Sequence, residues 1–152
     1  MATELPKYSV PPPLPPIAAL VMIVLVAVVA PISFLPQAVS LALGIPLALL
    51  SIGLWGWGMS SFVRRKENPL PNKPTERLLT GGAFGVSRHP LYAGETGGLV
   101  ALAVLLDTMI GLAVALIAAL FARSVAIAEE RYLEARFGEE YRAYRERVRR
   151  WI

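Results

Sequence analysis

The sequence predicts an all-α integral membrane protein with about four transmembrane helices, the last two of which form an antiparallel hairpin. Of the 152 residues, 55% are hydrophobic, and the mean hydropathy is +0.55. No charged residue or histidine occurs between Tyr8 and Phe62. A soluble domain of this length has too little interior to bury such a segment, whereas about 20 apolar residues cross a bilayer. These observations exclude a soluble enzyme, a disordered tail and a DNA-binding module.

The charge balance indicates a membrane surface as the partner. Lys and Arg number 15 against 11 Asp and Glu, which in a soluble protein would suggest nucleic acid. Here the basic residues adjoin apolar runs, which is typical of the cytoplasmic flanks of membrane spans and of attraction to anionic lipids. We therefore expect membrane lipids, and no nucleic acid, as partners. With no cysteine and one histidine, the sequence also predicts no metal site.

Residues 1–16 hold six of the thirteen prolines, which predicts a stiff, extended N-terminal arm in place of a helix. Two apolar runs follow at 17–35 and 38–63 and predict the first two spans, the first kinked or ended near Pro31. Small residues recur every four positions in the second run, on one face suited to close helix packing. They are Ser40, Gly44 and Ala48.

A basic loop rich in glycine and proline covers residues 64–89, and this composition excludes a long helix there. The third and fourth apolar runs, 91–106 and 109–128, are separated only by Asp107 and Thr108. So short a turn forces the two helices into an antiparallel hairpin. We expect the loop, the hairpin and the C-terminal segment to form the functional part of a single domain.

Residues 129–150 are charged and helix-prone, with an apolar stripe at steps of three and four and seven arginines elsewhere. The stripe consists of Leu133, Phe137, Tyr141, Tyr144, Val148 and Trp151. Gly138 is expected to interrupt the helix, which either lies on the membrane or covers a site; the two are compatible. Because Lys and Arg concentrate in 64–90 and 129–150, we expect both termini and the site on the cytoplasmic side.

Helix geometry brings two polar clusters to the same level. His89 and Glu130 lie 18 and 22 residues from the turn at 107–108, so at about 1.5 Å per residue both stand roughly 30 Å from it. The start of the third helix, with Arg88 and free backbone amides, suits an anion. Glu129 and Glu130, at the expected end of the fourth helix, oppose its macrodipole and suit a cation. A ligand with a carboxylate and a positive centre would fit both helix ends.

Glu95 and Arg123 are ionisable residues inside apolar runs, a costly placement that usually serves function. By the same rise they lie at similar levels, so they either pair across the hairpin as a structural lock or act on a substrate. Gly94, Gly97 and Gly98 leave the third helix thin. This suits either close helix packing or a flat ligand against the backbone.

Two longer patterns lie in the second half of the chain. The first is Gly81-Gly82-Ala83-Phe84-Gly85-Val86-Ser87-Arg88-His89-Pro90-Leu91-Tyr92-Ala93-Gly94. The second is Glu129-Glu130-Arg131-Tyr132-Leu133, followed by Phe137-Gly138-Glu139-Glu140-Tyr141-Arg142-Ala143-Tyr144 and by Val148-Arg149-Arg150. Together they resemble the isoprenylcysteine carboxyl methyltransferase and phospholipid methyltransferase family, with its Arg-His/Asn-Pro-x-Tyr-x-Gly, Glu-Glu-x-x-Leu and Phe-Gly-x-x-Tyr-x-x-Tyr motifs. The resemblance covers about half of the chain.

This resemblance implies S-adenosylmethionine as the cofactor and a lipophilic methyl acceptor, such as an isoprenylcysteine carboxylate or a phospholipid amine. It implies that the start of the third helix holds the methionine carboxylate, that the Glu pair faces the positive groups and that Tyr141 and Arg142 close the pocket. The implied cofactor-binding residues are Val86, Arg88, His89, Pro90, Leu91, Tyr92, Gly94, Glu129, Glu130, Tyr141 and Arg142. Glu95 is the candidate that orients or deprotonates the acceptor, and Arg123 is its candidate catalytic partner.

Two other interpretations stay open. Membrane sterol and steroid reductases end in a similar Arg-His-Pro-x-Tyr-x-Gly-Glu hairpin and use NADPH, but those chains are usually much longer. Few basic side chains here can clamp a nucleotide phosphate. A non-catalytic scaffold would have to keep charged residues at helix ends for packing alone, which is costly. The sequence therefore favours a methyltransferase.

Overall fold

The computed structural model describes residues 11–67 and 76–152, and these residues form helices joined by turns and loops. The all-α prediction is confirmed. The elements are α1 (Leu14–Val29), α2 (Gln37–Arg65), the short 3-10 helix η1 (Gly82–Gly85), α3 (Pro90–Leu105), α4 (Met109–Phe137) and α5 (Glu139–Arg147). Residues 1–10 of the predicted arm and 68–75 of the predicted loop lie outside the described residues.

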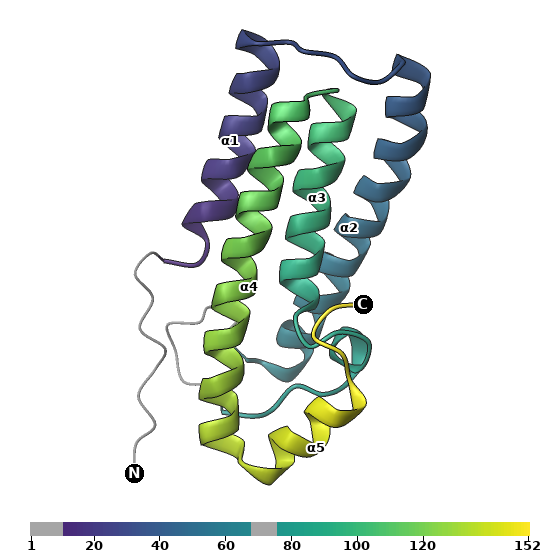
Figure 1. The fold of residues 1–152 in the computed structure, drawn as a ribbon. Coiled ribbons are helices and arrows are strands. Elements are labelled where there is room, and N and C mark those ends of the chain that lie inside the picture. The colour runs from purple at the N-terminus through teal and green to yellow at the C-terminus, as the bar shows by residue number, and fades with distance from the viewer. Residues whose placement is uncertain (1–10, 68–75) are drawn as a thin grey trace.

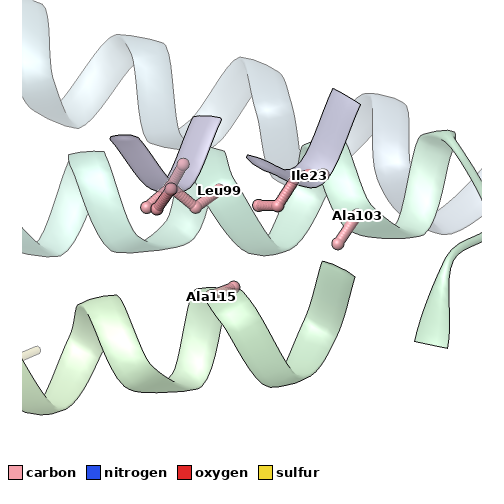
Figure 2. Close-up of a cluster of buried hydrophobic side chains, with 5 residues drawn as sticks. Ile23, Leu99, Ala103 and Ala115 are labelled. Carbon is pink, nitrogen blue, oxygen red and sulfur yellow. The ribbon is translucent and has the colours of Figure 1, made fainter. Parts of the chain in front are cut away.

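Four long helices lie side by side, with α5 across one end of the bundle (Figure 1). Helix α3 packs most extensively against α2 and also contacts α1 and α4. A small apolar core forms where three helices meet: Ile23 of α1, Leu99 and Ala103 of α3, and Ala115 of α4 (Figure 2). Burying these side chains stabilises the α1–α3–α4 contact through the hydrophobic effect.

The outside of the bundle is apolar. Helices α2 and α4 have 29 residues each and are long and apolar enough to cross a membrane. Large apolar side chains on the outer surface stay exposed, among them Val29 at 80%, Leu50 at 71% and Ile117 at 68%. Soluble monomers rarely show apolar patches of this extent, so the surface is suited to lipid. Helices α1 and α3, of 16 residues each, are shorter than a usual span of about 20 residues, and the count of four spans stays a prediction.

The two short connections lie together at the end of the bundle opposite α5 (Figure 1). One carboxylate oxygen of Asp107, in the α3–α4 turn, accepts hydrogen bonds from the backbone N–H groups of Phe34 and Leu35, at 3.1 and 3.0 Å. Thr108 caps α4 by accepting from the Gly111 N–H. The predicted hairpin is therefore confirmed, and Asp107 ties it to the α1–α2 connection.

Helices α2 and α3 approach closely along a stripe of small residues. Ser40 and Gly44 are buried against α3, as their spacing predicts: the Ser40 hydroxyl donates to the Val104 carbonyl. A Cβ at Gly44 would lie 2.6 Å from the Leu105 side chain. Because no larger residue fits there, these positions set the distance between the two helices.

Two predicted boundaries are wrong. Helix α1 begins at Leu14, inside the predicted arm, with prolines in its first turn. Proline is tolerated there because the first-turn N–H groups have no partner within the helix. Helix α4 continues past Ala128 to Phe137, so Glu129 and Glu130 lie within the helix and not at its end. The predicted break at Gly138 is confirmed, with a positive φ of 55° that favours glycine.

Candidate functional site

Three basic side chains converge on Glu130, which is buried in α4 with 5% of its surface exposed. Arg88 donates to Oε1 from Nε at 3.2 Å and from Nη2 at 3.0 Å. Arg150 donates to Oε1 at 2.9 Å and to Oε2 at 2.8 Å, and the His89 Nε2 lies 3.2 Å from Oε1. Both carboxylate oxygens thus accept hydrogen bonds from guanidinium groups, which offsets the cost of burying the charge. The predicted common level of His89 and Glu130 is confirmed.

Glu129 forms a second polar contact beside this cluster. The Tyr92 hydroxyl donates to its Oε1 at 2.6 Å, and the His89 Nδ1 lies 3.6 Å from its Oε2. His89 also stacks on Tyr92, with ring centroids 5.7 Å apart. Both ring nitrogens of His89 therefore face a carboxylate oxygen that can accept a hydrogen bond.

The chain after α5 is hydrogen-bonded to the loop that leads into α3. The Ser87 hydroxyl donates to the Arg150 carbonyl at 3.0 Å, and the Arg88 backbone N–H donates to the Arg149 carbonyl at 3.0 Å. The Arg88 guanidinium also donates to the Val148 carbonyl at 3.0 Å. Of the two interpretations of the C-terminal segment, this geometry favours a cover over the charged cluster.

Tyrosines of α5 face the same region. Tyr141 and Tyr144 are 1% and 3% exposed. Burial is the largest cause that raises the pKa of both, followed by the Glu130 carboxylate for Tyr141, so both hydroxyls stay protonated as donors. The Tyr144 hydroxyl donates to the Phe84 carbonyl at 2.6 Å. Within the described residues, the buried hydroxyls of Tyr132 and Tyr141 have no hydrogen-bond partner.

These features match a ligand with an anionic group and a cationic group. The start of α3 has no side-chain cap, and Pro90 occupies its first turn; the positive end of the helix dipole at this terminus favours an anion. An unpartnered buried hydroxyl such as that of Tyr141 costs about 1–3 kcal/mol, which a bound polar group would recover. Glu129 supplies a carboxylate at the same level for a cation.

The other residues that the resemblance implies for the cofactor have packing or surface positions in the structure. Pro90 and Leu91 pack against Gly58 of α2, and Val86 is 47% exposed. A Cβ at Gly94 would lie 2.9 Å from the Ser51 carbonyl of α2, so Gly94 serves the close packing of α3 against α2. Arg142 is also displaced: it is exposed and pairs on the surface with Glu139 and Glu134.

Glu95 and Arg123 do not form the lock that their spacing allows. Arg123 is exposed on α4, and within the described residues no ion pair joins the two. Glu95 is half-buried on α3, and Trp55 of α2 lines the same groove. It lines an apolar groove of about 550 Å³ between α1, α2 and α3.

Arg150 belongs to the Val148-Arg149-Arg150 pattern, but the sequence assigned it no role in the site. It is one of seven arginines after residue 129, and nothing in their spacing distinguishes the one that reaches Glu130. Because a buried carboxylate requires a basic partner, a buried Glu130 would have predicted that one of these arginines pairs with it.

Comparison with known proteins identifies the family. The sequence profile of the phospholipid methyltransferase family matches residues 39–140, more than half of the chain. The chain belongs to this family. Membership in the phospholipid methyltransferase family indicates a membrane methyltransferase, and the matched residues include the Arg88, His89, Glu129 and Glu130 cluster but not Arg150.

A match to a curated protein is shorter. An uncharacterized protein of Haemophilus influenzae is 62% identical over 24 residues, which cover 16% of this chain and 38% of that protein. The match therefore spans well under half of that curated relative. No solved structure matches the chain.

Proposed function

We propose that this protein is an S-adenosylmethionine-dependent methyltransferase that acts on a lipophilic acceptor. The observation that carries the proposal is the family match over residues 39–140. It is supported by the convergence of Arg88, His89, Tyr92 and the two glutamates of α4 at one end of the bundle.

The cofactor supplies a methyl group carried on a positively charged sulfur. We assign its carboxylate to the N-terminus of α3, where the helix dipole favours an anion, and its positive groups to the side of the Glu129 carboxylate. Tyr141, whose buried hydroxyl has no partner within the described residues, supplies a further donor. The chain has to align donor and acceptor and exclude water, which is the main requirement of a displacement at a methyl carbon.

The C-terminal segment is the element that would exclude water. Its backbone carbonyls bind Ser87 and Arg88, and its Arg150 neutralises Glu130. We therefore assign Glu130 mainly to holding this cover in place, with Glu129 nearer to the ligand. This assignment differs from the sequence pattern, which implied that Glu130 in the first place faces the positive groups of the cofactor.

We further propose that the charged end of the bundle faces the cytoplasm. It carries the Lys- and Arg-rich segments, whereas the opposite end carries Asp107. A water-soluble cofactor then enters from the cytoplasm, and a lipophilic acceptor enters from the bilayer.

The test is calorimetry of the purified protein in detergent with S-adenosylmethionine and, separately, with NADPH. Saturable binding of the first and none of the second is expected. Binding of NADPH alone would replace the proposal with a reductase, and binding of neither would leave a scaffold. Mass spectrometry of membranes incubated with methyl-labelled S-adenosylmethionine then identifies the molecule that gains the label.

A further inference from the structure

The groove between α1, α2 and α3 carries an inference about the acceptor, which rests on the proposed methyltransferase function. Its volume of about 550 Å³ is within the range of about 300–1,000 Å³ typical of small-molecule sites. Along α3 its wall runs from Glu95 to Leu105, a length of roughly 15 Å at about 1.5 Å per residue. Leu20, Ile52 and Leu102 line it, so it suits an apolar chain.

The volume limits the occupant to one chain. A water-sized group takes about 30 Å³, and a methylene is of similar size, so the groove holds on the order of 18 such groups. That is the size of one long hydrocarbon chain with its head group. A lipid with two long chains would leave one of them outside.

The head-group end of the groove is acidic. Among the described residues that line the groove, Glu95 is the charged one, and none is Lys, Arg or His. Trp55 lines the same groove. A carboxylate in an apolar groove attracts an ammonium group and repels another carboxylate.

The same residue connects the groove to the charged cluster. Glu95 and Tyr92 both line a small cleft between α3 and α4, and Tyr92 donates to Glu129. An acceptor head at Glu95 therefore lies one helical turn from the residues assigned to the cofactor.

We propose that this groove is the acceptor site and that it takes a single-chain amphiphile whose reactive head is an amine. An ammonium nitrogen must lose a proton before it attacks, and the Glu95 carboxylate accepts that proton. The freed lone pair forms the bond to the methyl carbon, while the electrons of the broken carbon–sulfur bond remain on the sulfur. An acceptor that reacts through a carboxylate is disfavoured because the groove offers it no positive partner.

The test compares two probes of equal chain length, hexadecylamine and hexadecanoic acid, with the full-length protein in phosphatidylcholine nanodiscs. Binding is followed by tryptophan fluorescence, with empty nanodiscs as the partition control. We expect the amine to bind at least about tenfold more tightly than the acid. Glu95→Gln should remove this preference while S-adenosylmethionine binding stays unchanged. Equal or tighter binding of the acid by the wild-type protein would refute the amine assignment.

A second variant tests the location. No atom lies within 4 Å of where a Cβ would stand at Gly98, on the groove wall, so Gly98→Leu should fold and fill the groove. Gly56→Leu is the matched control, because Gly56 has the same open space on α2 but does not line the groove. Gly98→Leu should weaken amine binding at least about tenfold, and Gly56→Leu should not. Unchanged amine binding by the Gly98→Leu variant would refute the location of the acceptor site. Failure of the wild-type protein to bind S-adenosylmethionine would instead refute the proposed function.

Discussion

Replacing Arg150 with glutamine should release the cover over the charged cluster. Arg150 binds both oxygens of Glu130, at 2.9 and 2.8 Å, with 30% of its own side chain and 7% of that of Glu130 exposed. Exposed ion pairs contribute about 0–1 kcal/mol, and breaking a buried pair costs about 3–5 kcal/mol. A half-covered pair with two contacts lies between these limits, so we expect a cost of about 2 kcal/mol to closure of the segment.

Hydrogen–deuterium exchange of residues 139–152 measures this cost directly. A loss of about 2 kcal/mol lowers protection by roughly thirtyfold if the segment opens locally. Arg149→Gln is the matched control, because the Arg149 side chain is exposed and its backbone carbonyl, not its side chain, binds Arg88. Equal protection in both variants would refute the role assigned to Arg150. So would a loss of protection that reaches α2 and α3, since it would indicate global unfolding.

Three further predictions follow from the same geometry. Glu130→Ala should weaken S-adenosylmethionine binding at least about tenfold by calorimetry, because the C-terminal cover loses its ion pair with Arg150; unchanged affinity in a folded variant would show that cofactor binding does not depend on this pair. Tyr141→Phe should leave thermal stability nearly unchanged but weaken cofactor binding, whereas Tyr144→Phe should destabilise the protein by about 1 kcal/mol because it loses the bond to the Phe84 carbonyl; the reverse order in a melting assay would contradict both assignments. A cysteine at exposed Met109 should react only with reagents on the side opposite the cytoplasm, because Met109 stands at the Asp107 end; exclusive labelling from the cytoplasm would overturn the orientation.

Much of the helical architecture follows from local sequence. The apolar runs, the two-residue turn at 107–108 and the break at Gly138 predict the hairpin and the end of α4, because helix formation and turn geometry depend mainly on neighbouring residues. The common level of His89 and Glu130 also follows, since every helical residue adds the same rise. Likewise, the spacing of Ser40 and Gly44 predicts the face on which α2 meets α3.

The features that the sequence left open depend on how each helix is rotated about its axis and on side chains that are distant in the sequence. Glu95 and Arg123 stand at similar levels, but helix packing turns Arg123 outward and Glu95 into the groove. Helix α4 runs through the two glutamates because Arg88 and Arg150, from elsewhere in the chain, neutralise Glu130. The sequence by itself therefore determined which residues are helical and at what height they lie. Only the tertiary structure decided which way they face and which arginine meets the buried acid, because both result from packing between segments far apart in the chain.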